Sequence, residues 1–334
     1  MVHMTLLAYP NCSISSIAGP IDAFAIANLW CRYLSRDKDE CAPMFYWDIV
    51  TPDGEPVSGY GRIPIQPHRS MHDVDSTDFI LIPGFLPPME FIGNVPEELA
   101  RWIRHWHDKN AMIGTTCTGT FLLAETGLLD GKVATTNWEF ARYFQKLYPK
   151  VHLKPERILT VDGNLICSGA TTAFLDLCLY LIEKFGSDEL AARCSKALLV
   201  EPNRRSQSPY FIFDYQKHHA DDKVLKAQYH MEERFAETIS VDSMASDLGI
   251  SPRHFKRRFK SATGDSPLIY LQRLRIEAAK QKLETTQETV NEITWQVGYE
   301  DSNSFRRLFK KHTGLSPREY RERFARTPRR AWVN

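Results

Sequence analysis

The sequence predicts an α/β domain with a mostly parallel sheet, followed by an all-α domain that contains two helix-turn-helix units. The first part of this prediction comes from short apolar runs that alternate with segments of helical spacing, because strands buried between layers of helices read as continuous apolar runs. The second part comes from a stretch near the C-terminus that occurs twice in register. With 334 residues, the chain can hold two or three domains that each bury a core.

The elements of the α/β domain follow from their apolar spacing. Residues 4–9 form a short apolar run that ends at Pro10, and residues 19–34 have apolar side chains at helical spacing, which predicts a buried strand followed by a helix. A turn around residues 161–164 predicts a hairpin. Further strands are expected at residues 45–51, 79–82 and 111–115, and further helices at residues 96–109, 118–125, 138–147 and 172–185.

A linker is expected between the two parts of the chain. Residues 202–209 combine prolines with polar side chains and lack periodicity. Apolar helical spacing resumes at Val224, where a new helix is expected. The expected organisation is therefore an α/β domain at 1–200, a linker at 201–222, a helical domain at 223–326 and a tail at 327–334.

Each copy of the repeat has the pattern of two helices joined by a glycine turn. The upstream segment places apolar residues at i, i+3, i+4 and i+7 and ends in a glycine, Gly249 in the first copy and Gly298 in the second. The next helix carries two phenylalanines four residues apart, so that one face packs while arginines and lysines lie on the other. In a helix-turn-helix unit, this second helix enters the major groove of DNA. A helical bundle that binds no nucleic acid is the alternative, but two basic helices in register favour DNA binding.

The repeat resembles the AraC/XylS family of transcription regulators over about residues 223–326. The resemblance implies two helix-turn-helix subdomains joined by a long helix, here residues 267–283. It also implies a homodimer that binds promoter DNA, acts with RNA polymerase and activates transcription. The buried side of the long helix is expected at Leu271, Leu274, Ala278 and Leu283. The candidate DNA contacts are Arg253, Lys256, Arg257 and Lys260 in the first unit, and Asn303, Arg306, Arg307 and Lys310 in the second.

Charge and cysteine usage narrow the class of protein. Residues 231–334 contain 20 Lys and Arg against 14 Asp and Glu, whereas residues 1–230 contain 22 against 27, so a basic surface is expected at the C-terminal end. Seven cysteines without a CxxC pair argue against a disulfide framework and a zinc site, and neither a metal nor a cofactor is expected. No signal peptide or membrane-crossing run is recognisable, which indicates a cytoplasmic protein without a membrane partner.

Cys117 stands where a predicted strand runs directly into a helix, within Gly114-Thr-Thr-Cys-Thr-Gly119. Such a turn presents its side chain at the edge of the sheet. It also places that side chain near a helix N-terminus, whose dipole and free N–H groups favour a thiolate. The pattern is typical of a nucleophile elbow.

With this order of elements, residues 4–187 resemble the ThiJ/PfpI domain of the class I glutamine amidotransferase-like superfamily, a flavodoxin-like fold. The combination with the C-terminal half is similar to the GlxA-type branch of AraC regulators, whose pattern is visible in residues 116–131 and 134–138. The resemblance places the family's elbow cysteine on Cys117 and its upstream acid on Asp22. Enzymatic relatives often carry a histidine where this chain has Thr118, and the GlxA-type branch often carries a histidine where this chain has Asn137. Since neither side chain can serve as a base, we expect a domain that binds a ligand without catalysis; the alternative is a cysteine-dependent hydrolase or amidase with a fused DNA-binding domain.

A ligand pocket is expected at the carboxyl ends of the strands, where open α/β sheets bind their ligands. An acid beside an aromatic ring would suit a cationic nitrogen, so a small nitrogen-containing metabolite is a candidate effector, although Trp138 fits a core position equally well. The residues expected to line the pocket are Asp22, Gly84, Cys117, Thr118, Asn137, Trp138 and Ser168.

Overall fold

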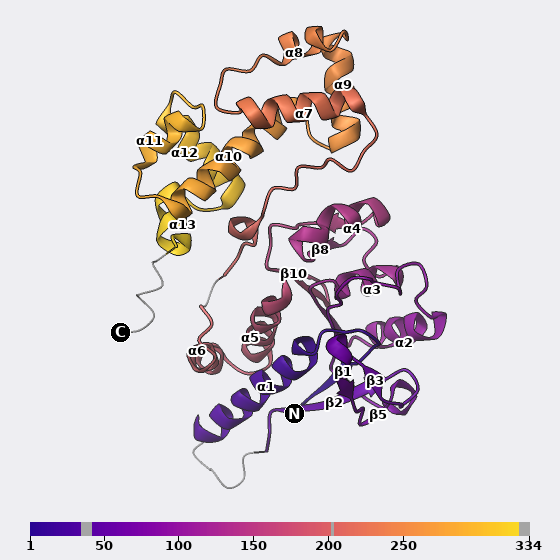
Figure 1. Ribbon diagram of the computed structural model, residues 1–334. Helices are drawn as coiled ribbons and strands as arrows, with labels where there is room; N and C mark the ends of the chain where they lie inside the picture. Colours follow the sequence, from indigo (N-terminus) through magenta and orange to yellow (C-terminus); the bar gives the residue numbers. More distant parts are fainter. Residues whose placement is uncertain (35–41, 202–203, 327–334) are drawn as a thin grey trace. The chain divides into compact units, whose positions relative to one another are not determined.

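The computed structural model describes residues 1–34, 42–201 and 204–326 (Figure 1). The chain divides into two compact units, and the boundary lies between Gln207 and Ser208. This boundary falls inside the segment 201–222 that the sequence assigns to a linker. The expected tail at 327–334 and two residues of that segment, 202 and 203, lie outside the described residues.

The first unit is built on a seven-stranded sheet with the order β10-β11-β7-β6-β1-β2-β5. Every pair of neighbours is parallel except β10 and β11, which form the expected hairpin with Gly163 at φ 66° in its turn. The mostly parallel sheet of the prediction is thereby confirmed. The strands are β1 (Val2–Leu7), β2 (Phe45–Thr51), β5 (Arg69–Ser70), β6 (Phe79–Ile82), β7 (Met112–Thr116), β10 (Leu159–Asp162) and β11 (Leu165–Ser168). Two small separate sheets pair β3 (Val57–Ser58) with β4 (Pro64–Ile65), and β8 (Val133–Ala134) with β9 (His152–Leu153).

Helices cover both faces of the sheet, and its central strands β6 and β7 are therefore buried along their whole length. Figure 1 shows α1 (Ser15–Leu34), α5 (Phe174–Phe185) and α6 (Asp188–Ala197) together on one side of the strands, with α2 (Glu97–Asp108) and α3 (Gly119–Glu125) on the other. Helix α4 (Ala141–Leu147) follows a 3-10 turn at Trp138–Phe140, so the helix expected at 138–147 is split. Helix α6 was not predicted. The Ser187 side chain caps it by accepting a hydrogen bond from the N–H of Leu190, and acids in its first turn and a lysine in its last turn suit the helix dipole.

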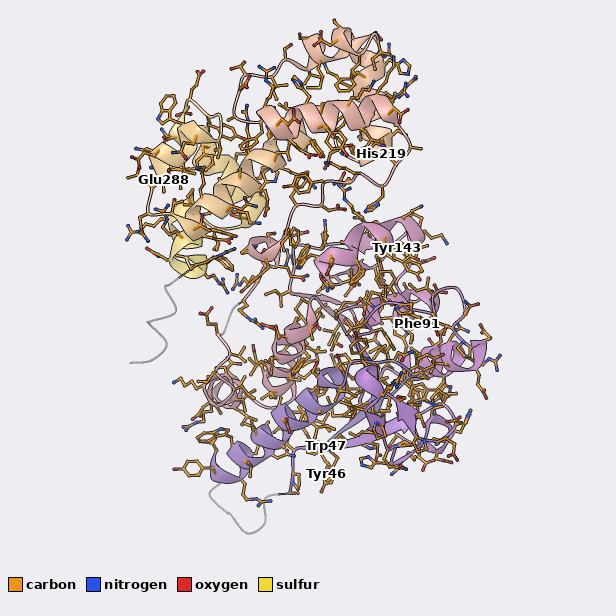
Figure 2. All side chains as sticks on the ribbon, viewed as in Figure 1. Tyr46, Trp47, Phe91, Tyr143, His219 and Glu288 are labelled. Atoms are coloured by element: carbon orange, nitrogen blue, oxygen red, sulfur yellow. The ribbon has the colours of Figure 1, made fainter. Side chains whose placement is uncertain are left out.

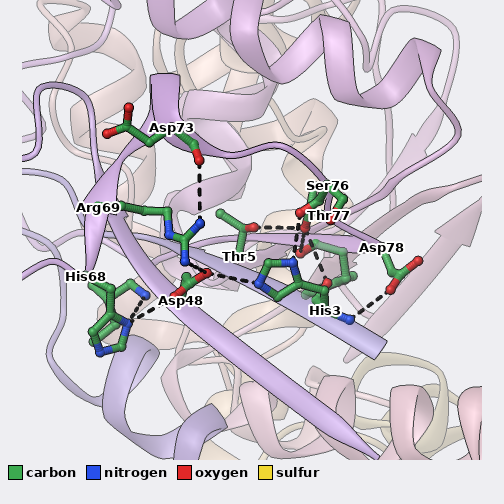
Figure 3. Close-up of polar contacts among 11 residues, drawn as sticks. His3, Thr5, Asp48, His68, Arg69, Asp73, Ser76, Thr77 and Asp78 are labelled. Carbon is green, nitrogen blue, oxygen red and sulfur yellow. Dashed lines mark hydrogen bonds and ion pairs between the residues drawn. The ribbon is translucent and has the colours of Figure 1, made fainter. Parts of the chain in front are cut away.

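Polar side chains connect β1, β2 and β5 near one edge of the sheet. Figure 3 shows the carboxylate of Asp48 on β2 surrounded by three basic side chains. His3 Nε2 lies 3.0 Å from Asp48 Oδ2, Arg69 Nη2 lies 3.3 Å from the same oxygen, and His68 Nδ1 lies 3.5 Å from Oδ1. Because β5 has only two residues, these contacts add to a ladder that is otherwise very short.

The second unit contains seven α-helices within the described residues 208–326. They are α7 (Asp222–Arg234), α8 (Val241–Asp247), α9 (Pro252–Thr263), α10 (Pro267–Thr285), α11 (Val290–Gln296), α12 (Ser302–Thr313) and α13 (Pro317–Phe324). They form two cores, each centred on a phenylalanine pair that is completely buried: Phe255 and Phe259 in the first, Phe305 and Phe309 in the second. The all-helical architecture with two repeated units is confirmed.

Helix α10 supplies both cores, as the expected connecting helix should. Leu271 and Leu274 lie in the first core and Leu283 in the second. Ala278, expected on the buried side, is half-buried, and its neighbour Ala279 is completely buried instead. The buried face shifts along α10 because its first half packs against one core and its second half against the other.

Part of the segment between the cores of the two units packs on the helical unit. Phe213 contacts the first helical core, and Lys280 on α10 donates to the backbone oxygen of Phe211 at 2.5 Å. Gln228 on α7 donates to the backbone oxygen of Tyr215 at 2.7 Å. Among the described helices, none is both long and apolar enough to cross a membrane.

Candidate functional site

The turn at Cys117 has the geometry of an elbow. Strand β7 ends at Thr116, Cys117 takes the left-handed backbone conformation with φ 53°, and α3 begins at Gly119. Only glycine fits at position 119, because a Cβ there would lie 2.3 Å from the backbone oxygen of Pro83. The close approach of α3 to the loop after β6 therefore holds the elbow in place.

The thiol of Cys117 is buried, and burial raises its pKa above the ordinary value. Hydrogen bonds from the N–H of Thr118 and from the side chains of Asn137, Thr171 and Thr118 act in the opposite direction without offsetting the burial. The N–H of Thr118 at the N-terminus of α3 favours a thiolate, as expected, but burial outweighs it and the pKa of Cys117 is raised. The groups that hydrogen-bond to this thiol include neither an acid nor a histidine.

Five of the predicted pocket residues gather around this elbow. A Cβ on Gly84 would lie 3.0 Å from Cys117 Cβ, and the N–H of Cys117 donates to the backbone oxygen of Ser168 at 3.0 Å. Thr118 Oγ1 accepts from the N–H of Phe85 at 2.7 Å and donates to its oxygen at 2.5 Å. With Asn137 at the thiol, the structure brings together residues at or after the ends of four strands, β6, β7, β8 and β11.

One predicted pocket residue, Asp22, lies away from the elbow. Asp22 is exposed on α1, whereas the residue of α1 that reaches the elbow is Ser16, whose Oγ accepts from Thr116 Oγ1 at 3.0 Å. Six residues separate Ser16 from Asp22, which is about 240° around the helix, so the two side chains occupy different faces. Trp138 is half-buried at the start of the 3-10 turn that follows Asn137.

A cavity of about 190 Å³ opens beside the elbow, at the carboxyl ends of β1 and β6. It shares Phe85 with the elbow, and its aromatic rings contact one another edge-on or tilted. The ring centroids of Tyr9 and Phe85 lie 6.2 Å apart, and those of Phe85 and Phe91 lie 4.5 Å apart. Phe91 is labelled in Figure 2. The complete lining is Tyr9, Pro10, Asn11, Phe85, Pro88, Met89, Glu90, Phe91 and Asn94.

In the helical unit, all predicted DNA contacts are exposed on one side of their helices. The Ser251 side chain caps α9 by accepting from the N–H of His254, and the Asp301 carboxylate caps α12 by accepting from the N–H groups of Asn303 and Ser304. The buried phenylalanines turn the opposite faces outward. Those exposed faces carry Arg253, Lys256, Arg257 and Lys260 on α9, and Asn303, Arg306, Arg307 and Lys310 on α12.

An open cavity of about 560 Å³ lies beside α9. Its lining includes Arg257 and Arg258 from α9, together with His219 and Asp221 from the segment that enters α7. His219 is labelled in Figure 2. Arg258 is already paired with Asp221, which leaves Arg257 as the lining residue that extends the exposed basic face.

Comparison with known proteins identifies both units. The profile of the DJ-1/PfpI family matches residues 43–184, and that of a helix-turn-helix domain matches residues 244–323. The HTH-type transcriptional regulator CdhR of Pseudomonas aeruginosa is 24% identical over 318 residues, which cover 94% of this chain and 90% of CdhR. The regulator GlxA of Rhizobium meliloti is 31% identical over 215 residues, 60% of this chain and 64% of GlxA. The chain is an AraC/XylS-family regulator with an N-terminal DJ-1/PfpI domain.

The fold of the first unit agrees with this assignment. The crystal structure of Drosophila melanogaster DJ-1beta superposes with a TM-score of 0.50 at 19% identity, covering 60% of this chain and 98% of DJ-1beta. The protein is an AraC-family DNA-binding transcriptional regulator. Its matched homologues are transcription regulators and not enzymes.

Sequence reasoning for this AraC-family regulator missed the aromatic cavity. Its walls come from Tyr9 and Phe85–Phe91, which directly follow β1 and β6. The rule that ligands bind beyond the carboxyl ends of parallel strands was a usable signal. By the same rule, the long loop from Phe85 to α2 borders this site, because it follows β6.

Proposed function

We propose that the regulator recognises a promoter operator through α9 and α12, and that a small metabolite bound by residues 1–200 controls its action on RNA polymerase, as an activator in the cytoplasm. The observation that carries this proposal is the pair of exposed basic faces at equivalent positions of two capped helices, each opposite a buried phenylalanine pair. Residues 201–222 link the sensor to the reading domain at 223–326.

Two reading helices on one chain favour two major-groove contacts on one face of the duplex, about one helical turn apart. Full-length protein should therefore select, from a randomised DNA pool, duplexes with two short conserved segments about 10 base pairs apart. Arg257→Ala combined with Arg306→Ala should weaken binding to the selected duplex and flatten its salt dependence. Selection of a single segment, or unchanged binding by the double variant, would contradict the assignment of these helices.

The effector site of this proposal combines the elbow with the aromatic cavity. Tyr9, Phe85 and Phe91 line it with aromatic rings, Glu90 with a negative charge, and Asn11 and Asn94 with carboxamides. Rings beside a carboxylate favour a small ligand with a cationic nitrogen. The neutral thiol of Cys117 and the neutral side chains around it support binding without catalysis.

Thermal-shift screening of amino acids, amines and quaternary ammonium compounds tests the effector site. A ligand of this class should raise the melting temperature of the wild-type protein, and Glu90→Gln should reduce that shift because it removes the negative charge at the cavity. Glu183→Gln, an exposed acid on α5, is the matched control. If Glu183→Gln reduces the shift as much as Glu90→Gln, the cavity is not the site.

The second candidate function is a cysteine-dependent hydrolase or amidase with a fused DNA-binding domain. The elbow geometry at Cys117 favours it, since φ 53° at a strand-to-helix turn is typical of nucleophiles. The raised pKa of the thiol speaks against it. A turnover assay on every compound that shifts the melting temperature distinguishes the two: product formation that disappears in Cys117→Ser would establish the enzyme.

A further inference from the structure

Each helix-turn-helix unit has a polar side chain that reaches from its first helix to its recognition helix, and the two units use different residues for it. Asp242 in α8 and Asn291 in α11 both lie seven residues before the glycine of their turn. Their partners are also equivalent, since Lys256 and Arg306 each directly follow the first buried phenylalanine of their helix. The same place in the fold therefore pairs an acid with a lysine in one unit, and an amide with an arginine in the other.

In the second unit the contact orients a guanidinium without cancelling its charge. Arg306 Nη2 donates to Asn291 Oδ1 at 3.3 Å, and Ser302 Oγ donates to the same oxygen at 3.1 Å. The carboxamide is thus held by two donors from the first two turns of α12. Of the five N–H donors of Arg306, those not used on Asn291 remain for the edge of a base, and a bidentate contact to guanine needs only two.

In the first unit the contact competes with DNA. Lys256 Nζ lies 3.3 Å from Asp242 Oδ1, and the side chains are 55% and 67% exposed. Pro252 stands where the second unit has Ser302, so the side chain that could add a second hydrogen bond is absent. A carboxylate at this place offsets the ammonium charge and repels phosphate oxygens, so Lys256 must leave Asp242 to bind the DNA backbone.

We propose that Asn291 is a positioning residue that orients Arg306 for base recognition, and that Asp242 restrains Lys256 and so lowers the sequence-independent attraction of the first unit for DNA. The inference rests on the proposal that α9 and α12 read the operator. The two units then have different roles, since α12 discriminates between bases at Arg306, while an acid tunes the attraction of α9 for DNA at Lys256.

The positioning role is tested on full-length protein with the duplex that it selects from a randomised pool, and with single base-pair variants of that duplex. Asn291→Ala should lose about tenfold of the discrimination at the base pair read by Arg306, while affinity for a scrambled duplex changes less than about twofold. Asn291→Asp keeps the oxygen acceptor and adds a charge. It should retain the discrimination but bind every duplex more weakly, with a flatter salt dependence.

The restraint by Asp242 is tested in the same assay. Asp242→Asn should bind selected and scrambled duplexes alike about two- to fivefold more tightly at low salt, with a slope of log K against log salt that is steeper by about one. Asp247→Asn removes the same charge from the last turn of the same helix and should change the slope less.

Three results would overturn the inference while leaving DNA reading by α9 and α12 intact. One is unchanged base discrimination in Asn291→Ala at an unchanged melting temperature. Another is an equal loss of discrimination in Asn291→Asp and Asn291→Ala, because the acceptor would then be irrelevant. The third is an equal change of slope in Asp242→Asn and Asp247→Asn. Failure to select any duplex would instead count against the proposed function.

Discussion

The thiol of Cys117 sits at a turn that normally activates nucleophiles, yet its surroundings keep it protonated. The residue is 5% exposed, and burial raises its pKa against four weaker hydrogen-bonding effects. The neutral side chains around the buried thiol already have hydrogen-bonding partners, so they form a rigid wall of the pocket. The elbow therefore has a structural role. The close packing of Gly119 keeps Cys117 in its strained left-handed conformation.

We expect Cys117→Ser to retain the response of the target promoter, because the change replaces S–H by O–H and leaves the hydrogen-bonding groups in place. Cys117→Trp should abolish the response, because an indole does not fit this buried site. The site is so tight that a Cβ added to Gly84 would lie 3.0 Å from Cys117 Cβ. Promoter response and DNA affinity measured for both variants check this. Loss of response in Cys117→Ser, with folding and ligand binding intact, would contradict a sensor without catalysis.

His312, in the last turn of α12, links the stability of the helical unit to pH. Its pKa is lowered from 6.5, first by burial and then by the positive charges of Arg273 and Lys311, with Asp265 acting in the opposite direction. The folded state therefore binds fewer protons than the unfolded state below pH 6.5. The contribution of His312 to stability is complete above this pH and is lost as the pH falls toward the folded pKa.

Denaturant unfolding of the helical unit between pH 8 and pH 5 should show this decrease, and His312→Gln should reduce it because glutamine does not titrate. His230, exposed on α7, provides a comparison in His230→Gln. An equal reduction in both variants would show that burial of His312 is not the cause.

At the scale of elements, each helix-turn-helix unit owes its stability to its own phenylalanine pair. Phe259 packs edge-on against Tyr270 at 5.3 Å in the first core, and Phe309 packs edge-on against Tyr320 at 5.5 Å in the second. The equivalent arrangement repeats because the same spacing of aromatic residues occurs in both copies. Helix α10 connects the two cores, and Phe235, which follows α7, packs against both of them.

Phe259→Ala and Phe309→Ala should each cost about 3 to 5 kcal/mol, the usual loss for an emptied aromatic site. We expect the loss to remain local: hydrogen exchange should accelerate in α8 and α9 for Phe259→Ala, and in α11 and α12 for Phe309→Ala. Uniform acceleration across both units in either variant would mean that the two cores unfold as one.

At the scale of the whole molecule, we propose that two chains pair through the α/β unit, because a second chain doubles the length of DNA that is read. Full-length protein at micromolar concentration should sediment at twice its mass of 38.5 kDa. A fragment of residues 1–207 should likewise sediment at twice its own mass. Residues 208–334 alone should sediment as a monomer. A purely monomeric residue 1–207 fragment would count against pairing through this unit.

Local pattern was sufficient for much of the architecture. The buried strands, the hairpin at Gly163, the two recognition helices and the elbow at Cys117 were all predicted, because each depends on the spacing of a few neighbouring residues. Helix α6 was missed because most of its apolar residues are alanines, which mark a buried face only weakly, and its Ser187 cap and charged ends were not recognised.

The sequence by itself determined that two helix-turn-helix units follow an α/β domain, since repeats, periodicity and capping residues act within a few turns of chain. Only the tertiary structure decided which side chains meet. It brought Asn137 to Cys117, turned Asp22 to another face of α1, closed the cavity between Tyr9 and Phe91, and set Asp242 and Asn291 against their recognition helices. These contacts depend on how separate elements pack, and burial then decides their chemistry, as it does for the protonated thiol of Cys117.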